Sequence, residues 1–408
     1  MTSQQSAEAG VVAAPHFNPS AFSPEAAKTL RTVLNDGFYR DSLRLPRPTE
    51  QYGLSEPFVF LDYFRKRRNC WGYSAMDGFY RKRLTSEKGR VAVHLFDLFW
   101  RAEPVTESDL RQTLGEDKIA MLADASIVSR ENGLVRPNIR IIAVPHLFSM
   151  FDIDRTNRGD FIYFGTDSQD YVEIIDQECG DRHFERSLDL CTGSGVQGLS
   201  LATRSEEVVC TDLNARALSY VNANASLNGL GNVRTLESDL FTKITGRFDC
   251  ITANTPYVPM PDDADAHDLP MRGGDLGIEF TFELLEQALD YLSPTGIAPI
   301  YTSDPILNKG PHLAEALTRK FGHLPLDFTQ INIFRSHPNT DRQRQHFQKH
   351  NMVAFDDCVL VVRTASRFAV RKQSWNPSYY WRSKLLRFNY SSDPAVATPD
   401  QNTATTPA

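Results

Sequence analysis

The residues best suited to chemistry are Asn254, Thr255, Pro256 and Tyr257, which directly follow an apolar stretch that predicts a strand over 248–253. The Asn254 side-chain oxygen and the Thr255 backbone carbonyl can accept hydrogen bonds from the two N–H groups of a planar amine or amide. The Tyr257 ring can pack on the flat face of such a group. The four residues are therefore suited to presenting a nitrogen to an electrophile, although taken alone they are more typical of an ordinary turn.

A second motif lies about 60 residues upstream, where an apolar strand ending at Asp189 runs into the turn Cys191-Thr192-Gly193-Ser194-Gly195. An apolar segment suited to a helix follows. The spacing also fits the Gly-x-Gly-x-x-Gly rule, so a dinucleotide-binding oxidoreductase is the competing interpretation. Asp189 argues against it, because a carboxylate in this place would repel a pyrophosphate but tolerate a cationic amino-acid group.

The next predicted strand, 207–212, ends at Asp212, which is placed to accept hydrogen bonds from ribose hydroxyls. A nucleoside that carries a positively charged amino-acid tail matches both Asp189 and Asp212. S-adenosylmethionine is such a molecule.

In this order the motifs resemble class I S-adenosylmethionine-dependent methyltransferases, and the Thr-Gly-Ser-Gly core is closest to the HemK/PrmC-like branch. The resemblance covers roughly residues 160–365. It includes Asn254 to Tyr257, which resemble the Asn-Pro-Pro-Tyr motif, and Arg272 to Phe280, which resembles the Gly-Gly-x-x-Gly segment that follows it. The resemblance implies S-adenosyl-L-methionine as the cofactor, with Asp212 at the ribose and Asp239 at the adenine amine. The residues that it assigns to cofactor binding are Asp189, Cys191, Thr192, Gly193, Ser194, Gly195, Asp212, Leu213, Asp239, Leu240 and Asn254.

This chain departs from the family pattern in three places. Cys191 stands where the family has glycine, which adds a small side chain beside the cofactor's amino-acid group. Thr255 replaces the first proline of the Asn-Pro-Pro-Tyr motif, but the backbone carbonyl at that position survives the change. The short helical N-terminal domain with which the family recognises release factors has no evident counterpart, so the resemblance does not extend to that substrate.

Strands and helices alternate from residue 186 onward, which predicts a parallel sheet covered on both faces with ligands at the carboxyl ends of the strands. The resemblance implies an α/β, Rossmann-like sheet of seven strands with the last antiparallel. Asp189, Asp212, Asp239 and Asn254 would converge on one rim. The predicted strands are 186–190, 207–212, 232–237, 248–253, 296–302, 327–334 and 356–363, and the predicted helices include 214–228 and 279–292.

The N-terminal half has its own pattern. Helical spacing over 90–100, 106–115 and 117–125 is followed by a predicted β-hairpin that ends near Ile142, an order that suggests a winged-helix-like module. Asp117, Lys118 and Asp124 give the expected recognition helix a net negative charge. We therefore expect a substrate-covering or interaction module rather than a DNA-binding one.

The 408 residues predict two folded domains with tails. Six cysteines are scattered without a Cys-x-x-Cys or Cys/His cluster, so we expect reduced thiols and no metal site. The chain has no start typical of a secretory signal and no run of 18 apolar residues, which predicts a cytoplasmic protein with no membrane segment. The expected organisation is a disordered 1–20, an N-terminal domain 21–155, a methyltransferase domain 156–365, a basic-aromatic extension 366–390 and a disordered 391–408.

Two segments, 64–83 and 367–390, place arginine and lysine among aromatic residues, a combination that can bind single-stranded nucleic acid. The overall net charge of −7 favours the simpler interpretation, in which the aromatic rings pack and the charges are solvated.

We predict N-methylation of a planar amine or amide nitrogen by direct displacement. Asn254 and Tyr257 are the predicted catalytic residues, and the segment from Asn254 to Tyr257 binds the acceptor. The predicted acceptor is a small molecule or a protein side chain. The alternatives are a nucleic-acid amine, a different reaction that consumes S-adenosylmethionine, and a regulator that senses this molecule without catalysis.

Overall fold

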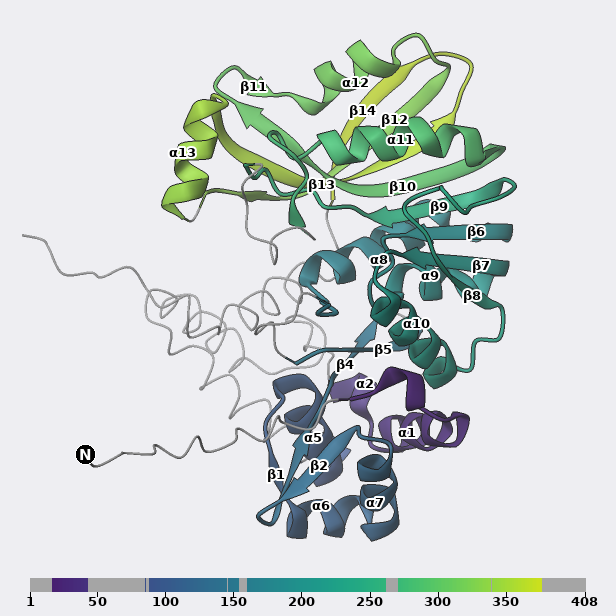
Figure 1. Cartoon of the computed structure of the whole chain (residues 1–408), viewed down its shortest axis with the longest axis vertical. Coiled ribbons are helices and arrows are strands. Elements are labelled where there is room, and N and C mark those ends of the chain that lie inside the picture. The colour runs from purple at the N-terminus through teal and green to yellow at the C-terminus, as the bar shows by residue number, and fades with distance from the viewer. Residues whose placement is uncertain are drawn as a thin grey trace, which may run out of the picture. The chain divides into compact units, whose positions relative to one another are not determined.

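The structure is a computed structural model of the chain (Figure 1). Its described residues fall into two compact units, one that ends at Ile142 and one that begins at Ala143, and each is described by itself. The predicted basic segment 64–83 lies outside the described residues. The structure describes residues 17–42, 85, 88–144, 146–153, 160–261, 271–338 and 340–375.

The first unit combines short helices with a three-stranded sheet in the order β1-β3-β2. The three predicted helices are present, although the first continues beyond Leu95 as a π-helical turn. Two of the unit's helices have N-terminal caps. The side chains of Ser23 and Thr106 accept hydrogen bonds from the backbone N–H groups of Ala26 and Asp109, at the starts of α1 and α6. The elements are η1 (Pro19–Ala21), α1 (Pro24–Asp36), α2 (Tyr39–Ser42), α5 (Arg90–Leu95), η2 (Phe96–Arg101), β1 (Val105–Thr106), α6 (Glu107–Leu114), α7 (Glu116–Asp124), β2 (Val128–Glu131) and β3 (Leu134–Pro137).

The predicted hairpin forms, because Asn132 and Gly133 both have the positive φ that a tight turn between β2 and β3 requires. The chain after this turn does not form one continuous strand. It is divided after Pro137 into β3 and β4 (Arg140–Val144). Asn138 causes the break, since its backbone N–H and its side chain bond the carbonyl oxygens of Ile127 and Ser126 instead of a neighbouring strand.

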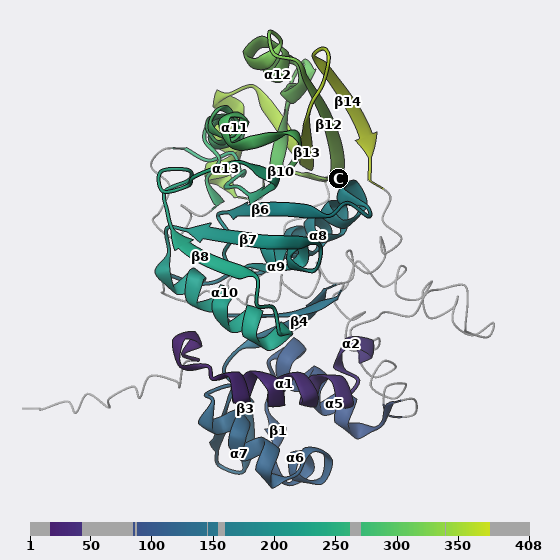
Figure 2. The same cartoon turned by 90° about the vertical axis from the view of Figure 1, so that its right-hand side faces the viewer.

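The second unit contains a large twisted sheet in the order β14-β12-β13-β10-β9-β6-β7-β8, with β11 paired to β10 (Figure 2). All seven predicted strands are present. The strands are β6 (Phe184–Leu190), β7 (Ser205–Asp212), β8 (Val233–Glu237), β9 (Phe248–Asn254), β10 (Leu292–Leu307), β11 (Gly310–Pro311), β12 (Leu326–Ser336), β13 (Met352–Thr364) and β14 (Ala369–Ser374), and a separate two-stranded sheet pairs β4 with β5 (Leu147–Phe151).

The sheet has nine strands in the described part of the chain rather than the seven implied by the family resemblance, because β11 and β14 are added to it. β13 runs antiparallel to both β10 and β12, and the short added strand β11 is antiparallel to β10. β14 pairs in parallel with β12, so the segment expected to be a separate extension is part of the sheet up to Ser374. At the other end, ordered structure precedes residue 21, since Phe17 is buried against Phe22.

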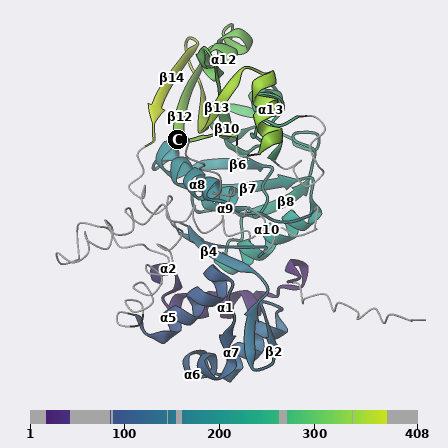
Figure 3. The same cartoon turned by 90° about the vertical axis from the view of Figure 1, so that its left-hand side faces the viewer.

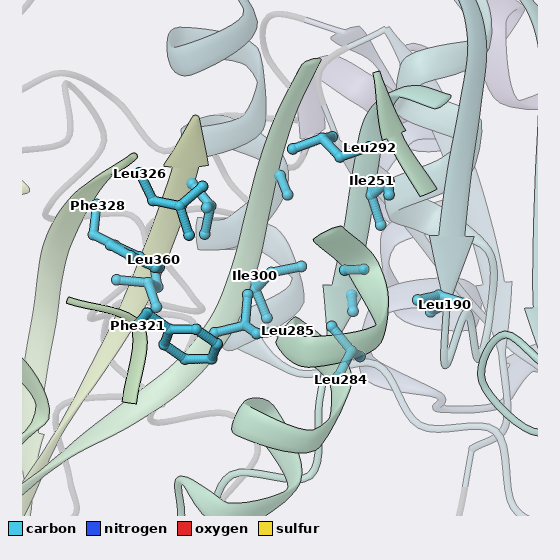
Figure 4. Packing of buried hydrophobic residues seen from close by; sticks show 14 of the residues in the cluster. Leu190, Ile251, Leu284, Leu285, Leu292, Ile300, Phe321, Leu326, Phe328 and Leu360 are labelled. Carbon is cyan, nitrogen blue, oxygen red and sulfur yellow. The ribbon is translucent and has the colours of Figure 1, made fainter. Parts of the chain in front are cut away.

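Helices cover the sheet of the second unit. α11 and α12 contribute to one large apolar core with the strands (Figure 4). α8 and α9 also contact the strands. Successive side chains of a strand point to opposite faces of the sheet. In β6, Leu188 and Leu190 belong to the apolar core, whereas Asp189 between them accepts a hydrogen bond from the Gly198 N–H of α9. The helices are α8 (Thr166–Cys179), α9 (Val196–Leu201), α10 (Ala215–Asn228), α11 (Glu279–Tyr291), α12 (Leu313–Phe321) and α13 (Asp341–Lys349).

Two asparagines on α10 bond the edge of β5 as a neighbouring strand would. Asn228 exchanges both hydrogen bonds with the backbone of Phe148, and Asn224 does the same with Met150, at 2.7–3.1 Å. The Asn224 amide also donates to the carbonyl of Ser194 at 2.8 Å. The strand β5 is thereby attached to the loop that precedes α9.

Two further sequence predictions concern thiols and membranes. The five described cysteines are free, and all except Cys191 are buried. None of the described helices combines the length and the apolar composition needed to cross a bilayer.

Candidate active site

Four parallel strands, β9, β6, β7 and β8, end along one rim of the sheet. The register pairs Leu190 with Ala253 across β6 and β9, and Asp212 with Glu237 across β7 and β8. Because neighbouring parallel strands end at the same edge, Asp212 and Asn254 lie on this rim, and Asp239 follows the end of β8. The structure therefore brings together the polar residues that the sequence placed after separate strands.

Asn254 is held in one orientation at the end of β9. Its amide nitrogen donates to the Asp167 carboxylate at 2.9 Å, and Ser168 Oγ lies 3.4 Å from the same nitrogen. A carboxylate can only accept, so this contact fixes which side of the amide carries the oxygen. That oxygen, Asn254 Oδ1, is buried and has no hydrogen-bond partner among the described residues. An unsatisfied buried acceptor costs about 1–3 kcal/mol, and a ligand N–H would remove this cost.

The N-terminal turn of α8 supports Asn254, and sequence reasoning did not identify it. Besides Asp167 and Ser168, α8 carries Tyr171, whose hydroxyl accepts from the Ala253 N–H at 3.0 Å and donates to the Pro299 carbonyl at 2.5 Å. This buried tyrosine fixes the backbone immediately before Asn254. The only sequence signal for these residues was an acidic first turn at a helix start, which is common on surfaces.

Thr255 points into the protein, not into the rim. Its hydroxyl donates to the Tyr301 carbonyl at 2.7 Å and lies 3.2 Å from the hydroxyl of Thr281, which in turn lies 2.7 Å from that of Thr302. All of these groups are buried. The buried hydroxyl chain supplies a fixed anchor for the turn where the family has the ring of a proline.

Tyr257 lies against Tyr301, with ring centroids 4.9 Å apart and an interplanar angle of 51°. Burial raises the pKa of Tyr257 well above its usual value, so the side chain stays a neutral phenol at physiological pH. Gly277, at φ +81°, allows the chain to approach this turn closely, because a Cβ there would lie 2.4 Å from the Tyr257 carbonyl oxygen. The Tyr257 ring is therefore a fixed apolar surface and not a base.

Asp189 is completely buried and organises the loop Cys191–Gly195. Its carboxylate accepts from the Thr192 hydroxyl, from the Gly198 N–H at 3.0 Å and from the Thr252 hydroxyl at 2.8 Å. Burial raises its pKa from 3.8 to about 6, against the opposing effect of these hydrogen bonds. The expectation that Asp189 faces a cationic ligand group is thus revised, since its oxygens bond the protein.

Asp212 presents a carboxylate at the end of β7. Oδ2 accepts from the Gly193 N–H and Oδ1 from the Asn214 N–H, both at 2.9 Å, which leaves further lone pairs for hydroxyl donors. Burial raises the pKa of Asp212. The next residue, Leu213, is 68% exposed, which is unusual for a leucine and suits contact with a flat apolar ligand face. Asp239 is exposed beyond β8, next to Leu240.

Cys191 has a φ of +52°, in the left-handed region that favours glycine. A side chain in this conformation costs about 1 kcal/mol, so we expect Cys191→Gly to keep cofactor affinity and to leave the melting temperature unchanged or higher. Differential scanning calorimetry and cofactor titration measure both. Gly195→Ala is the control of opposite sign, because Gly195 has φ +83° and a Cβ there would lie 2.9 Å from Val221 Cγ2. A large loss of stability in Cys191→Gly would contradict the assignment of strain.

The second unit matches known proteins. Residues 166–322 match the family of the methyltransferase small domain. A release factor glutamine methyltransferase of Deinococcus radiodurans is 36% identical over 141 residues, which cover 32% of this chain and 49% of that protein. A ribosomal protein uL3 glutamine methyltransferase of Xanthomonas campestris pv. campestris is 35% identical over 129 residues, which cover 29% of this chain and 42% of that protein. Residues 166–322 are therefore identified as a methyltransferase small domain that is similar in sequence to glutamine methyltransferases.

The chain spans less than half the length of these two relatives. Among solved structures, Trm5b from Pyrococcus abyssi is similar to it, with 17% identity and a TM-score of 0.37 over 58% of this chain and 62% of that chain. The region that matches the methyltransferase small domain begins at the first residue of α8 and therefore includes Asp167, the residue that orients Asn254.

Proposed function

We propose that this protein transfers a methyl group from S-adenosylmethionine to the side-chain amide nitrogen of a glutamine in another protein. The observation that carries the proposal is the buried Oδ1 of Asn254, which has no partner among the described residues and is oriented by Asp167. A carboxamide NH2 is planar and has two N–H donors, so one of them satisfies this oxygen. The Tyr257 ring beside the turn suits its flat face.

Bound S-adenosylmethionine supplies an electrophilic methyl group on its sulfonium sulfur. Of the chain's residues, Asp212 would accept from the ribose hydroxyls, Leu213 would contact the adenine face and Asp239 would accept from the adenine amine. The features that fit this assignment are the free lone pairs of Asp212 and the exposed leucine that follows it. Asp189 stabilises the conformation of the Cys191–Gly195 loop through hydrogen bonds such as the one that it accepts from the Gly198 N–H.

Catalysis in this proposal comes from orientation. Asn254 Oδ1 accepts from one N–H of the acceptor, so the nitrogen is held with its lone pair directed along the line of attack, and such positioning can contribute roughly 7–11 kcal/mol. Tyr257 cannot remove a proton, because burial raises its pKa. No base is needed before the attack, since an amide nitrogen becomes strongly acidic once it carries the methyl group and then loses its proton to water.

The relatives favour glutamine among planar nitrogens. The two relatives described above are glutamine methyltransferases, one named for release factors and one for ribosomal protein uL3. Both of these acceptors are proteins of the translation machinery. We therefore propose that the acceptor of this protein is also a translation protein and that the reaction takes place in the cytoplasm.

We infer that the first unit is a winged-helix module that docks the protein acceptor. Its support is the order α5, β1, α6, α7, β2, β3 with the sheet order β1-β3-β2. DNA is disfavoured as its partner, because α7 carries Glu116, Asp117 and Asp124 against one lysine. We further infer that strands β6 to β10, β12 and β13 are the seven-stranded methyltransferase sheet and that β11 and β14 are additions to it.

Nucleic acid is not favoured by the described part of the basic-aromatic extension either. Arg371 forms an ion pair with Asp327 at 3.1 Å, and Lys372 bonds the buried Asp304 at 3.0 Å. Both cations therefore have partners in the fold. The remaining basic residues of this extension lie outside the described residues, apart from Arg367.

The test is an incubation of the purified protein with methyl-labelled S-adenosylmethionine and separate protein, RNA and small-molecule fractions. We expect label in the protein fraction, and we expect acid hydrolysis to release it as methylamine, because only an amide N-methyl group is freed this way. Label that survives hydrolysis on an amino acid would indicate an amine acceptor. Label confined to RNA or to small molecules would overturn the glutamine proposal.

A further inference from the structure

A cluster of metal-ligand type lies beside the acceptor turn and has no part in methyl transfer. His346 and His350 are four residues apart at the end of α13, and Asp275 belongs to the loop 271–278, which we call the glycine loop. One ring nitrogen of each histidine and one carboxylate oxygen of Asp275 lie within 4.8 Å of one another. Figure 3 shows α13 beside β13.

The three side chains are close but incompletely bonded. The two imidazole rings lie 4.5 Å apart, and His346 is only 4% exposed. His350 Nε2 lies 3.7 Å from Asp275 Oδ1, and this nitrogen is buried with no hydrogen-bond partner among the described residues. A buried ring nitrogen that faces a carboxylate without a bond carries a cost that a shared cation would remove.

His346 makes a contact that is typical of a metal-bound histidine. Its Nε2 lies 2.8 Å from the backbone carbonyl oxygen of Asp275. When Nε2 carries the proton it donates this bond, and Nδ1 then keeps its lone pair. Metal-ligating histidines almost always donate their second ring N–H to a carbonyl or a carboxylate, which fixes the tautomer and the ring orientation.

We propose that His346, His350 and Asp275 bind a divalent transition metal ion, with zinc as the best match. Two imidazoles four residues apart on a helix with one carboxylate form a donor set that zinc accepts, and a solvent molecule completes the four-coordinate shell. Zinc–ligand distances near 2.0–2.1 Å place ligand atoms about 3.3 Å apart, so ligand atoms that now lie up to 4.8 Å apart must approach by up to about 1.5 Å. Asp275 is 47% exposed, which leaves a path for the ion and room for this movement.

The ion would join α13 to the wall of the acceptor site. The glycine loop bonds the residue after Tyr257 on both sides, since the Val258 N–H donates to Met271 O at 2.8 Å and the Gly273 N–H donates to Val258 O at 3.0 Å. On the other side, Phe347 of α13 belongs to a small apolar cluster against which Tyr257 packs. Metal binding would therefore stiffen the surroundings of Tyr257 without touching the reacting atoms.

No metal site was predicted from the sequence. The spacing of the histidines is visible in the sequence, but Asp275 lies 71 residues before His346. The third ligand is supplied only by the pairing of the glycine loop with α13.

The test uses full-length protein, freed of any affinity tag and treated with a chelator. Isothermal titration with zinc chloride, elemental analysis after dialysis and the visible spectrum of the cobalt-substituted protein measure binding. We expect one equivalent of zinc in the wild type, a tetrahedral cobalt spectrum, and a higher melting temperature with zinc. His346→Ala, His350→Gln and Asp275→Ala should each weaken binding by at least about tenfold.

His323→Ala is the matched control, because His323 is an exposed histidine elsewhere in the same unit and its loss should leave binding unchanged. Circular dichroism shows whether each variant folds, and His350→Gln keeps the test valid if the more buried His346 proves essential for folding. Absence of stoichiometric binding in the wild type, or equal binding in folded ligand variants, would overturn the proposal. These measurements need no methyl acceptor, so they stand independently of the proposed function.

Discussion

Replacing Asn254 with alanine is expected to slow methyl transfer severely while S-adenosylmethionine still binds. The substitution removes the buried Oδ1 that would accept from the acceptor N–H, and with it the group that sets the direction of the nitrogen lone pair. Loss of one positioned hydrogen-bonding group at a reacting centre lowers kcat by about 10²–10³-fold. Single-turnover kinetics with labelled cofactor, together with cofactor titration, separate the two effects.

Two further variants sharpen this test. Asn222→Ala removes an exposed asparagine of α10 and serves as the matched control, for which we expect unchanged turnover. Asp167→Ala leaves Asn254 in place but removes the carboxylate that orients its amide, so we expect a smaller fall, in kcat more than in KM. Parallel loss of cofactor affinity in Asn254→Ala would contradict the assignment of this residue to the acceptor.

Asp189→Asn is expected to change how stability depends on pH while keeping the loop intact. Burial raises the pKa of Asp189 from 3.8 to about 6, so the folded protein holds the proton more tightly than the unfolded chain. The stabilisation from this group is therefore fully present below pH 3.8 and lost as the pH rises through 6. At about 1.36 kcal/mol per pH unit, the difference between 3.8 and about 6 corresponds to about 3 kcal/mol.

The measurement is urea unfolding at several pH values. Between pH 3.8 and about 6, the free energy of unfolding of the wild type should fall by roughly 3 kcal/mol relative to Asp189→Asn, in which no charge is buried. An asparagine fits because its oxygen can take the place of Oδ2, and its NH2 can donate to the Thr252 hydroxyl, which then turns toward another acceptor.

Asp189→Ala is the contrasting variant. It removes both carboxylate oxygens that accept from Thr192, Gly198 and Thr252, so we expect a loss of several kcal/mol and of cofactor binding. If Asp189→Asn lost cofactor affinity as completely as Asp189→Ala, the carboxylate would have to contact the ligand directly. The assignment of Asp189 to the loop would then be wrong.

The departure at Thr255 illustrates how a motif can change without losing its geometry. The family that this chain resembles has a proline here, whose ring restricts the backbone conformation of the turn. In this chain the Thr255 hydroxyl bonds the Tyr301 carbonyl and continues into Thr281 and Thr302. The sequence shows the substitution but not its compensation, because the partners lie on α11 and β10, up to 47 residues away.

Much of the fold could be predicted from the chain because its signals are local. Apolar stretches such as 248–253 and the helical spacing of 214–228 depend on neighbouring residues, and β9 and α10 form there. The ordered motifs then predicted the rim, since parallel strands end at one edge. The interruptions of strands were harder to predict. At Asn138 the strand ends because this residue donates hydrogen bonds to the carbonyl oxygens of Ile127 and Ser126.

The alternation of the strands and helices, the loop before α9 and the identity of the Asn254–Tyr257 turn could all be predicted, because each depends on residue types within a few positions of one another. The groups that these residues contact follow from the folding of the whole chain. It buried Asp189, paired Asn254 with Asp167 and brought Asp275 to His346 and His350. Such partners lie about 70–90 residues apart, and their meeting depends on how the whole sheet is packed, which no local pattern records.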